Sequence, residues 1–273
     1  MTPATQSPNL VALSAPSNRI GLAQTIHDTL IMAQRGLLKI RRTPEQLFDV
    51  TLQPVIFTLL FTFVFGGAIA GNVAAYLPIV IPGILVQTVV AGSSATGTQL
   101  REDMDKGVFD RFRTLPIARI APLAGALTAD IVRYLIAITI TLLMGALLGW
   151  RPGGGAAGIA GAVLLLVACA WAVSWIFAFI GVISRSAGSV QGISLLILFP
   201  LTFLSNAFVP ADTLPEWLQR FVAVNPITHL INALRELLNQ GAFGQEGLLA
   251  LLGAAGIVAI MAPLAVGAYK ARV

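Results

Sequence analysis

The sequence predicts an all-α membrane protein in which several helices cross the bilayer. Only 11% of its 273 residues are charged, 56% are hydrophobic, and the mean hydropathy is +0.85. A soluble domain carries about a quarter charged residues. The apolar runs are continuous and lack the alternating polarity that the strands of a membrane β-barrel require. The composition therefore indicates helices surrounded by lipid.

Six membrane spans account for the uncharged stretches. A helix that crosses the bilayer needs about 20 residues, so the charge-free run from Val50 to Leu100 holds two. The other four runs are Tyr134–Trp150, Pro152–Ser184, Ser186–Ala211 and Gly247–Tyr269. Six spans place both termini on the same side of the membrane.

Basic residues predict which side that is. Lys and Arg concentrate in cytoplasmic loops, and 13 of the 17 basic residues fall on the side of the termini: Arg19, Arg35, Lys39, Arg41, Arg42, Arg101, Lys106, Arg111, Arg113, Arg119, Arg185, Lys270 and Arg272. We expect a multi-pass protein of the cell membrane with both termini in the cytoplasm. The formal charge of +5 is then a topology signal, and no nucleic-acid partner is expected.

Three segments follow one another along the chain. Residues 1–18 are expected to form a disordered cytoplasmic tail. Residues 19–42 form an amphipathic helix, with apolar Ile26, Leu30, Ala33, Leu37 and Ile40 opposite polar Asp28, Arg35, Lys39 and Arg42. This helix either lies in the inner headgroup layer or packs on a partner protein. Residues 43–273 form the six-helix transmembrane domain, which begins at the capping-box sequence Thr43-Pro44-Glu45-Gln46.

Two short amphipathic helices are expected at the outer leaflet between the last two spans. The first follows a cap at Thr213 and carries Trp217, and the second follows Pro226. Within or beside the spans, Pro54, Pro78, Pro82 and Pro200 leave backbone groups that neighbouring helices or water must satisfy. The glycines of residues 153–161 either allow close helix packing or simply form a loop.

No enzymatic chemistry is predicted. The sequence contains no GxxxxGK[ST] motif, so the chain has no phosphate-binding loop of that type, and any ATP with its Mg must be bound by another polypeptide. His27 and His229 are the only histidines and have no ligand cluster, so we expect no metal site, no bound cofactor and no catalytic residue.

Asp130 and Arg133 are the exception among the apolar runs. Their spacing places them on one helical face, and two charges cannot face lipid at mid-depth. With Trp150 at the outer interface, the pair lies near the inner headgroups. Two interpretations stay open: an interfacial pair that steadies helix packing, or part of a translocation path or gate.

The segment of residues 101–116 holds 8 of the chain's 29 charged residues around a short apolar helical face. That face comprises Val108, Phe109, Phe112 and Leu115, and Asp110, Arg111 and Arg113 flank it. From spacing alone the face either inserts into a groove on a partner, dips into the headgroup layer, or belongs to a solvated loop.

Two motifs make the chain resemble the permease subunits of ABC-2-type exporters, in particular the daunorubicin-resistance and multidrug group. One is LSNAFVPADTLPEWLQRFVAVNPITHLINALREL, residues 204–237, and the other is KGVFDRFRTLPIAR, residues 106–119. His229 departs from this pattern, since an aromatic residue is more usual there. The resemblance implies that two permeases, identical or paralogous, pair in the membrane with separate ABC ATPase subunits. It also implies that the segment from Val108 to Leu115 docks on the ATPase.

The implied function is export of an amphipathic or hydrophobic solute, a drug or a lipid-like molecule. Polar residues of the second and fifth spans are candidate pathway residues: Thr88, Ser93, Ser94, Ser194, Thr202, Ser205 and Asn206. They serve equally well as helix-packing contacts. Three alternatives stay open, namely a transporter driven by an ion gradient, an exporter of glycans, and a membrane scaffold.

Overall fold

The computed structural model describes residues 21–113, 117–210 and 213–272, and says nothing of the side chains of residues 40, 41, 44–49, 110 and 113. Every regular element in the described residues is a helix, and the tail expected over residues 1–18 lies outside them. In chain order the helices are α1 (Leu22–Arg42), α2 (Pro44–Ala70), α3 (Val73–Asp105), α4 (Val108–Arg113), α5 (Ala121–Leu147), α6 (Gly155–Ile183), α7 (Ala187–Phe203), α8 (Glu216–Val224), α9 (Pro226–Gln240) and α10 (Gln245–Arg272).

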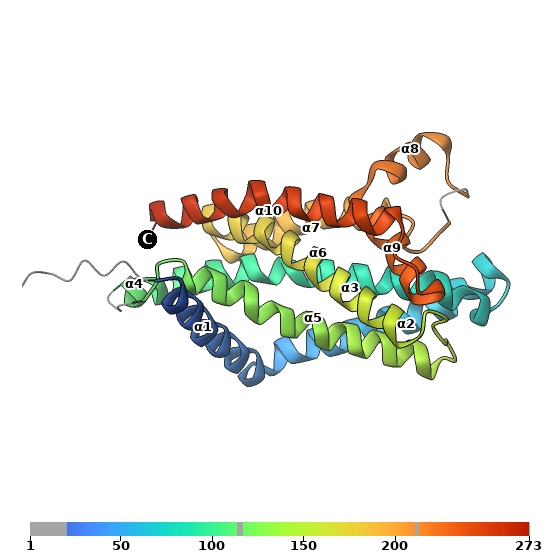
Figure 1. Cartoon of the computed structure of the whole chain (residues 1–273), viewed down its shortest axis with the longest axis horizontal. Helices are drawn as coiled ribbons and strands as arrows, with labels where there is room; N and C mark the ends of the chain where they lie inside the picture. The colour runs from blue at the N-terminus through green and yellow to red at the C-terminus, as the bar shows by residue number, and fades with distance from the viewer. Residues whose placement is uncertain (1–20, 114–116, 211–212, 273) are drawn as a thin grey trace, which may run out of the picture.

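The long helices form an elongated bundle with two distinct ends (Figure 1). The short α4, the start of α1 and the end of α10 lie at one end, which we call the α4 end. At that end Arg101 donates to the carbonyl of Ser184 at 3.1 Å, and Arg272 donates to the carbonyl of Ile183 at 2.9 Å. Helices α8 and α9 lie at the opposite end, the α9 end.

Five of the described helices are long and apolar enough to cross a membrane: α2 from Val50, α3, α5, α6 and α10. Helix α7 has 17 residues, about 25 Å at 1.5 Å per residue, whereas the hydrocarbon core is about 30 Å thick. Within the expected fifth span, Ser186–Ala211, the helix ends at Phe203. All-helical architecture is confirmed, and the number of six spans stays a prediction.

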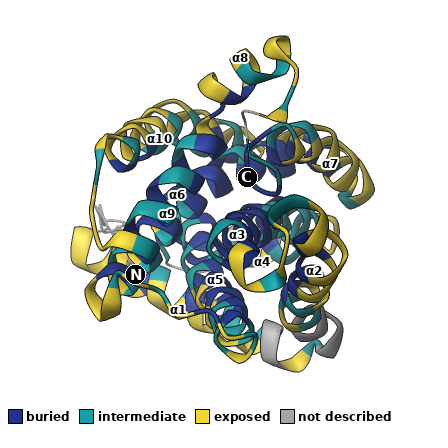
Figure 2. Ribbon diagram, turned by 90° about the vertical axis from the view of Figure 1, so that its right-hand side faces the viewer, coloured by how far each residue is buried: buried dark blue, intermediate teal, exposed yellow. Residues whose placement is uncertain are grey.

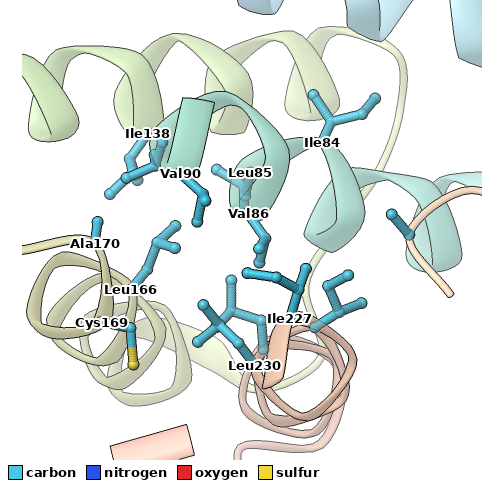
Figure 3. Packing of buried hydrophobic residues seen from close by; sticks show 14 of the residues in the cluster. Ile84, Leu85, Val86, Val90, Ile138, Leu166, Cys169, Ala170, Ile227 and Leu230 are labelled. Carbon is cyan, nitrogen blue, oxygen red and sulfur yellow. The ribbon is translucent and has the colours of Figure 1, made fainter. Parts of the chain in front are cut away.

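Helix α3 lies at the centre of the bundle. In its most apolar window 72% of the residues are buried, against 28% in α2 and 11% in α10. Figure 2 shows the same contrast, with the outer faces of α2, α7 and α10 exposed. In Figure 3, Val86 and Val90 of α3 pack with Leu166 of α6 and Leu230 of α9. Because lipid tails are as apolar as these side chains, close packing rather than escape from water holds such helices together.

Glycines bring two pairs of helices into backbone contact. A Cβ atom on Gly97 of α3 would lie 2.2 Å from the carbonyl oxygen of Phe177, and one on Gly181 of α6 would lie 2.4 Å from the carbonyl oxygen of Gly97. A Cβ atom on Gly154 or Gly158 would lie 2.1 or 2.2 Å from the carbonyl oxygen of Leu237 in α9. The glycines of residues 153–161 therefore serve close helix packing, which the sequence left open.

Helix α9 satisfies backbone groups that prolines leave free in α3. Pro82 has no N–H, so the carbonyl of Pro78 loses its helical donor, and the amide of Asn239 donates to it at 3.3 Å. The apolar face of α9 is buried as well, through Ile227, Leu230, Ile231, Leu234 and Leu238. The predicted amphipathic helix after Pro226 is thus present, and its polar face packs as well, through Arg235 and Asn239. Its position at the outer leaflet stays a prediction.

Arg235 of α9 holds the irregular segment that follows α7. Its guanidinium donates to the carbonyl of Ile79 at 3.1 Å and to the carbonyl of Asn206 at 2.7 Å. Burial lowers the pKa of Arg235 to about 10, and the nearby Tyr76 opposes this shift. The group is thus protonated at neutral pH and keeps its donors. Buried non-helical backbone requires such partners.

Helix α1 packs against α5 through small side chains. A Cβ atom on Gly36 would lie 2.8 Å from the Cβ of Ala129. Asp28, expected on the water-facing side, is instead 3% exposed and accepts a hydrogen bond from the N–H of Ala118 at 2.9 Å. Ile26 and Leu30 stay 60% and 58% exposed. The helix itself is present, and its position at the membrane surface stays a prediction.

The two predicted caps differ from the observed helix starts. Helix α2 begins at Pro44 as predicted, but the Thr43 hydroxyl donates to the carbonyl of Lys39 at 2.9 Å instead of capping. Helix α8 begins only at Glu216, and the Thr213 hydroxyl donates to the carbonyl of Pro210 at 2.7 Å. The predicted start at Thr213 is therefore wrong.

Candidate functional site

A cavity of about 490 Å³ lies between α2, α3, α5 and α7. Sites for small molecules have volumes of about 300–1,000 Å³, mostly apolar walls and a few polar groups. Here the apolar wall includes Phe57, Leu195, Leu198, Phe199 and Phe203. We call this space the α3 cavity, because α3 contributes the largest part of its lining.

The candidate pathway residues divide into two groups. Thr88, Ser94, Ser194 and Thr202 line the α3 cavity. The other three are absent from its lining and make structural hydrogen bonds, with Ser93 donating to the carbonyl of Val90, Ser205 to the carbonyl of Thr202, and Asn206 to the side chain of Asn232. Whether any of the seven contacts cargo stays a prediction.

Asp130 and Arg133 form a buried ion pair. Arg133 Nη1 lies 3.2 Å from Asp130 Oδ1, and the two residues are 4% and 2% exposed. The hydroxyl of Thr96 in α3 donates to the other carboxylate oxygen. Helix α5 begins at Ala121, so the pair lies well inside it and not at the start of a span from Tyr134. Intramembrane charges usually face the interior of a helix bundle in this way.

Three buried side chains in the wall of the α3 cavity have unpaired polar atoms. No nitrogen of the Arg133 guanidinium has a hydrogen-bond partner within the described part of the chain, nor does Gln87 Oε1 or Ser194 Oγ. Ser194 is among the predicted pathway residues, whereas Gln87 and three further glutamines of the lining, Gln53, Gln99 and Gln191, are not. The sequence feature that could have identified these glutamines is a polar amide side chain within a charge-free run.

Helix α4 is fixed to the bundle by its aromatic side. Gly107, with φ of +66°, turns the chain between α3 and α4. The Phe109 ring is 6% exposed and packs edge to face on Tyr269 of α10, with ring centroids 5.4 Å apart, and on Phe112 at 5.9 Å. The expectation that Phe109 is exposed for a partner is therefore wrong, because its own bundle covers it.

The rest of α4 has a mixed surface. Val108 and Phe112 are half-buried and Arg111 is exposed, whereas Leu115 lies outside the described residues, as do the side chains of Asp110 and Arg113. The guanidinium of Arg35 in α1 lies 5.0 Å from the centre of the Phe112 ring, close enough for a cation–π contact. Helix α4 therefore contacts both α10 and α1.

Ionic contacts join α1 to the end of α3. The ammonium of Lys39 lies 2.9 Å from one carboxylate oxygen of Asp103, and Arg35 Nη1 lies 3.6 Å from the other. At the α9 end, His229 Nδ1 lies 2.6 Å from a carboxylate oxygen of Glu246 and so connects α9 to α10. No role was predicted for His229.

The chain resembles known membrane permeases over almost all of its length. A profile of the family described as ABC-2 type transporter matches residues 27–239. The chain is 42% identical over 264 residues to the daunorubicin resistance ABC transporter permease protein DrrB1 of Streptomyces coeruleorubidus, covering 97% of this chain and 93% of that protein. It is 24% identical over 273 residues, 99% of each, to the probable doxorubicin resistance ABC transporter permease protein DrrC of Mycobacterium tuberculosis. The putative transport permease ycf38 of Cyanophora paradoxa is 27% identical over 234 residues, covering 80% of this chain and 76% of that protein. The α3 cavity and α4 lie inside the residues that match the family profile.

Proposed function

Because the chain belongs to the ABC-2 type transporter family and is thus a membrane permease of the ABC exporter type, we propose that it is the membrane subunit of an ATP-driven exporter. Separate ABC ATPase subunits bind ATP with Mg and dock on the loop that carries α4. The energy of the ATP cycle moves an amphipathic or hydrophobic solute, a drug or a lipid-like molecule, outward across the cell membrane.

The observation that carries this proposal is the attachment of α4. A partner that pushes on the exposed side of α4 displaces a helix whose Phe109 ring is packed on Tyr269. Through Arg35 the same displacement reaches α1, and through Gly107 it reaches α3. A rigid contact of this kind transmits motion, since packed side chains deform little.

The α3 cavity supports the choice of cargo. Its walls are mostly apolar, and among the described residues that line it neither Asp nor Glu occurs. An apolar or amphipathic molecule fits such a wall, whereas a hydrophilic ion would lose its hydration there. The relatives described as daunorubicin and doxorubicin resistance permeases favour a drug-like solute for this chain also.

We further propose that two permeases, two copies or this chain with a paralogue, pair in the lipid bilayer. We also propose that both termini are cytoplasmic and that the α4 end, where α1 begins and α10 ends, faces the cytoplasm. Arg101, Lys106, Arg111 and Arg272 supply the basic residues typical of a cytoplasmic face there.

The test separates docking from transmission. Arg111→Glu reverses a charge on the exposed side of α4, so we expect loss of co-purification with the cognate ABC ATPase. Phe109→Leu keeps α4 apolar but removes the ring contact with Tyr269, so we expect normal co-purification and reduced ATP-dependent efflux of a dye panel. Arg220→Glu makes the same charge reversal at the α9 end and serves as the control.

Normal co-purification and efflux with Arg111→Glu would contradict docking on α4. Efflux from vesicles that contain the permease without any ATPase subunit would contradict ATP-driven export and favour an ion gradient as the energy source.

A further inference from the structure

A second cavity lies between α6, α7, α9 and α10, on another face of α7 from the α3 cavity. Its volume is about 260 Å³. Its lining includes buried Val173, Phe177 and Leu230, together with Ile197 of α7 and Gly253 of α10, which are exposed. The cavity therefore opens at the surface of the bundle between α7 and α10, and we call it the α10 pocket.

The wall of the α10 pocket is almost entirely hydrocarbon. Among the described residues that line it, Cys169 carries the one side chain that is not hydrocarbon. The Cys169 thiol already donates to the carbonyl of Ala250 at 3.8 Å. A polar ligand would lose its hydrogen bonds with water in such a place, so the pocket suits a ligand, or part of one, that is purely apolar.

Small residues of α10 leave free space along that helix. Ala250, Gly253, Ala254 and Ile257 recur at spacings of three and four residues, so they share one face. A Cβ atom on Gly253 would meet no atom within 4 Å. The pocket therefore follows a helix that is long and apolar enough to cross the membrane.

The depth and size of the α10 pocket favour one kind of occupant. Residues 250–257 follow the start of α10 at Gln245 by 5 to 12 residues, which is about 8–18 Å at about 1.5 Å per residue. One leaflet contributes about 15 Å of hydrocarbon, so this is acyl-chain depth in the leaflet at the α9 end. Sites for drug-sized molecules are larger, about 300–1,000 Å³. A helix of a second permease, about 10 Å wide, is too thick to enter.

We propose that the α10 pocket binds one acyl chain of a phospholipid from the leaflet at the α9 end. The chain enters between α7 and α10 and packs on Ile176, Ile197 and Ile257, which would lose these contacts in an empty pocket. Leu198 lines both the α10 pocket and the α3 cavity. The bound chain thus stabilises the helix that forms one wall of the α3 cavity. This lipid is a resident molecule and not cargo, so the inference goes beyond the proposed function.

A photoreactive lipid tests the site. The full-length permease is placed in phosphatidylcholine nanodiscs that contain a small fraction of phosphatidylcholine with a diazirine in the middle of one acyl chain. After irradiation, mass spectrometry locates the adducts. We expect adducts at half-buried Ile176 and Ile257 to outnumber those at Leu252 and Ile260, which lie outside the pocket and are 59% and 60% exposed. Lipid that only surrounds the protein would give the reverse order, because its contacts follow exposure.

Gly253→Leu fills the pocket with a side chain from its own wall. We expect adducts at Ile176 and Ile257 to fall at least about fivefold, since a chain forced into filled space is overpacked, and adducts outside the pocket to stay unchanged. Gly256→Leu is the matched control. A Cβ atom on Gly256 also meets no atom within 4 Å, but Gly256 does not line the pocket, so we expect the wild-type pattern.

Adducts that follow exposure in the wild-type protein would overturn the inference, as would an absence of adducts in the pocket because a second permease covers it. An unchanged pattern in Gly253→Leu, or an equal loss in both variants, would also overturn it. The wild-type comparison does not depend on the folding of any variant. These measurements contain no ATP and no ATPase, so their failure leaves the proposed ATP-driven export standing.

Discussion

Asn225 is the residue that joins α7 to α9. Its side-chain oxygen caps α9 by accepting from the N–H of Ile227 at 2.9 Å, and its amide donates to the carbonyls of Leu201 and Leu204 at 2.8 and 2.9 Å. One side chain thus serves the start of one helix and the end of another. The resemblance to exporter permeases singled out Asn225 as part of a motif, and the structure gives that motif a physical role.

We predict that Asn225→Ala lowers the free energy of unfolding by about 1–3 kcal/mol, because it removes a cap and takes the Asn225 donor away from two part-buried carbonyls. Asn72→Ala is the control, since Asn72 only caps α3 and is exposed, and we expect it to cost about 1 kcal/mol or less. Thermal unfolding in detergent measures both. Equal midpoints for the two variants would contradict the double role.

The sequence predicts polar residues in the spans well but not their partners. Thr88 and Ser94 line the cavity as pathway candidates, whereas Asn206 lies against α9. Whether a polar residue lines the cavity or packs against α9 depends on where α7 ends. Because the apolar run continues to Ala211, the sequence does not reveal that the helix ends at Phe203. The apolar composition of a span indicates that lipid surrounds it. The position at which its helix ends depends on tertiary contacts.

Among the helices, α3 and α6 are held together at one glycine crossing. Gly97 and Gly181 face one another with room for no side chain. Small residues at such crossings let backbones approach closely, which strengthens packing in lipid. The crossing lies towards the α4 end, because Gly181 is two residues before the end of α6 at Ile183 and Gly97 is eight residues before the end of α3 at Asp105.

Gly97→Ala is predicted to lower the free energy of unfolding by about 1–3 kcal/mol, because its methyl group would overlap the carbonyl of Phe177. Gly256→Ala in α10 is the matched change in open space, with no atom within 4 Å of the new methyl. We expect it to stabilise the helix by about 0.5–1 kcal/mol, since alanine loses less entropy than glycine. The same sign for both variants in thermal unfolding would refute the crossing as a steric constraint.

Asp103 connects α1 to α3 through two cations. We predict that Asp103→Asn lowers the free energy of unfolding by about 1 kcal/mol, a value typical of a part-exposed ion pair. Glu102→Gln removes the more exposed pair with Lys106 and is expected to change stability by less than about 0.5 kcal/mol. Repeating both measurements at high salt should shrink the difference, and a salt-independent difference would argue against an ionic link.

The elements themselves could largely be predicted. The uncharged runs located α2, α3, α6 and α10, and spacing located α4 and α9. The start of α5 was missed, because Asp130 and Arg133 read as the edge of a span. A charge pair can lie inside a helix bundle when neighbouring side chains such as Thr96 bind to it. The sequence alone does not show which residues those neighbours are.

The whole molecule has two chemically different ends, and its orientation in the membrane is testable. With Cys169, the single cysteine, replaced by alanine, new cysteines report which end faces outward. We predict that Trp217→Cys at the α9 end reacts with a membrane-impermeant maleimide in intact cells, since Trp217 is 71% exposed. Lys106→Cys at the α4 end should react only after lysis. Labelling of both in intact cells would contradict six spans with cytoplasmic termini.

The contact between Phe109 and Tyr269 makes the last turn of α10 important for any shortened version of the protein. Tyr269 and Arg272 belong to the last turn of α10, and they hold α4 and the end of α6. A protein shortened just before Tyr269 would keep every long apolar helix and still insert, yet its α4 would lose the surface on which it rests. We expect such a protein to reach the membrane in normal amounts but to fail in transport. A measurement of its amount in the membrane would therefore not detect the defect.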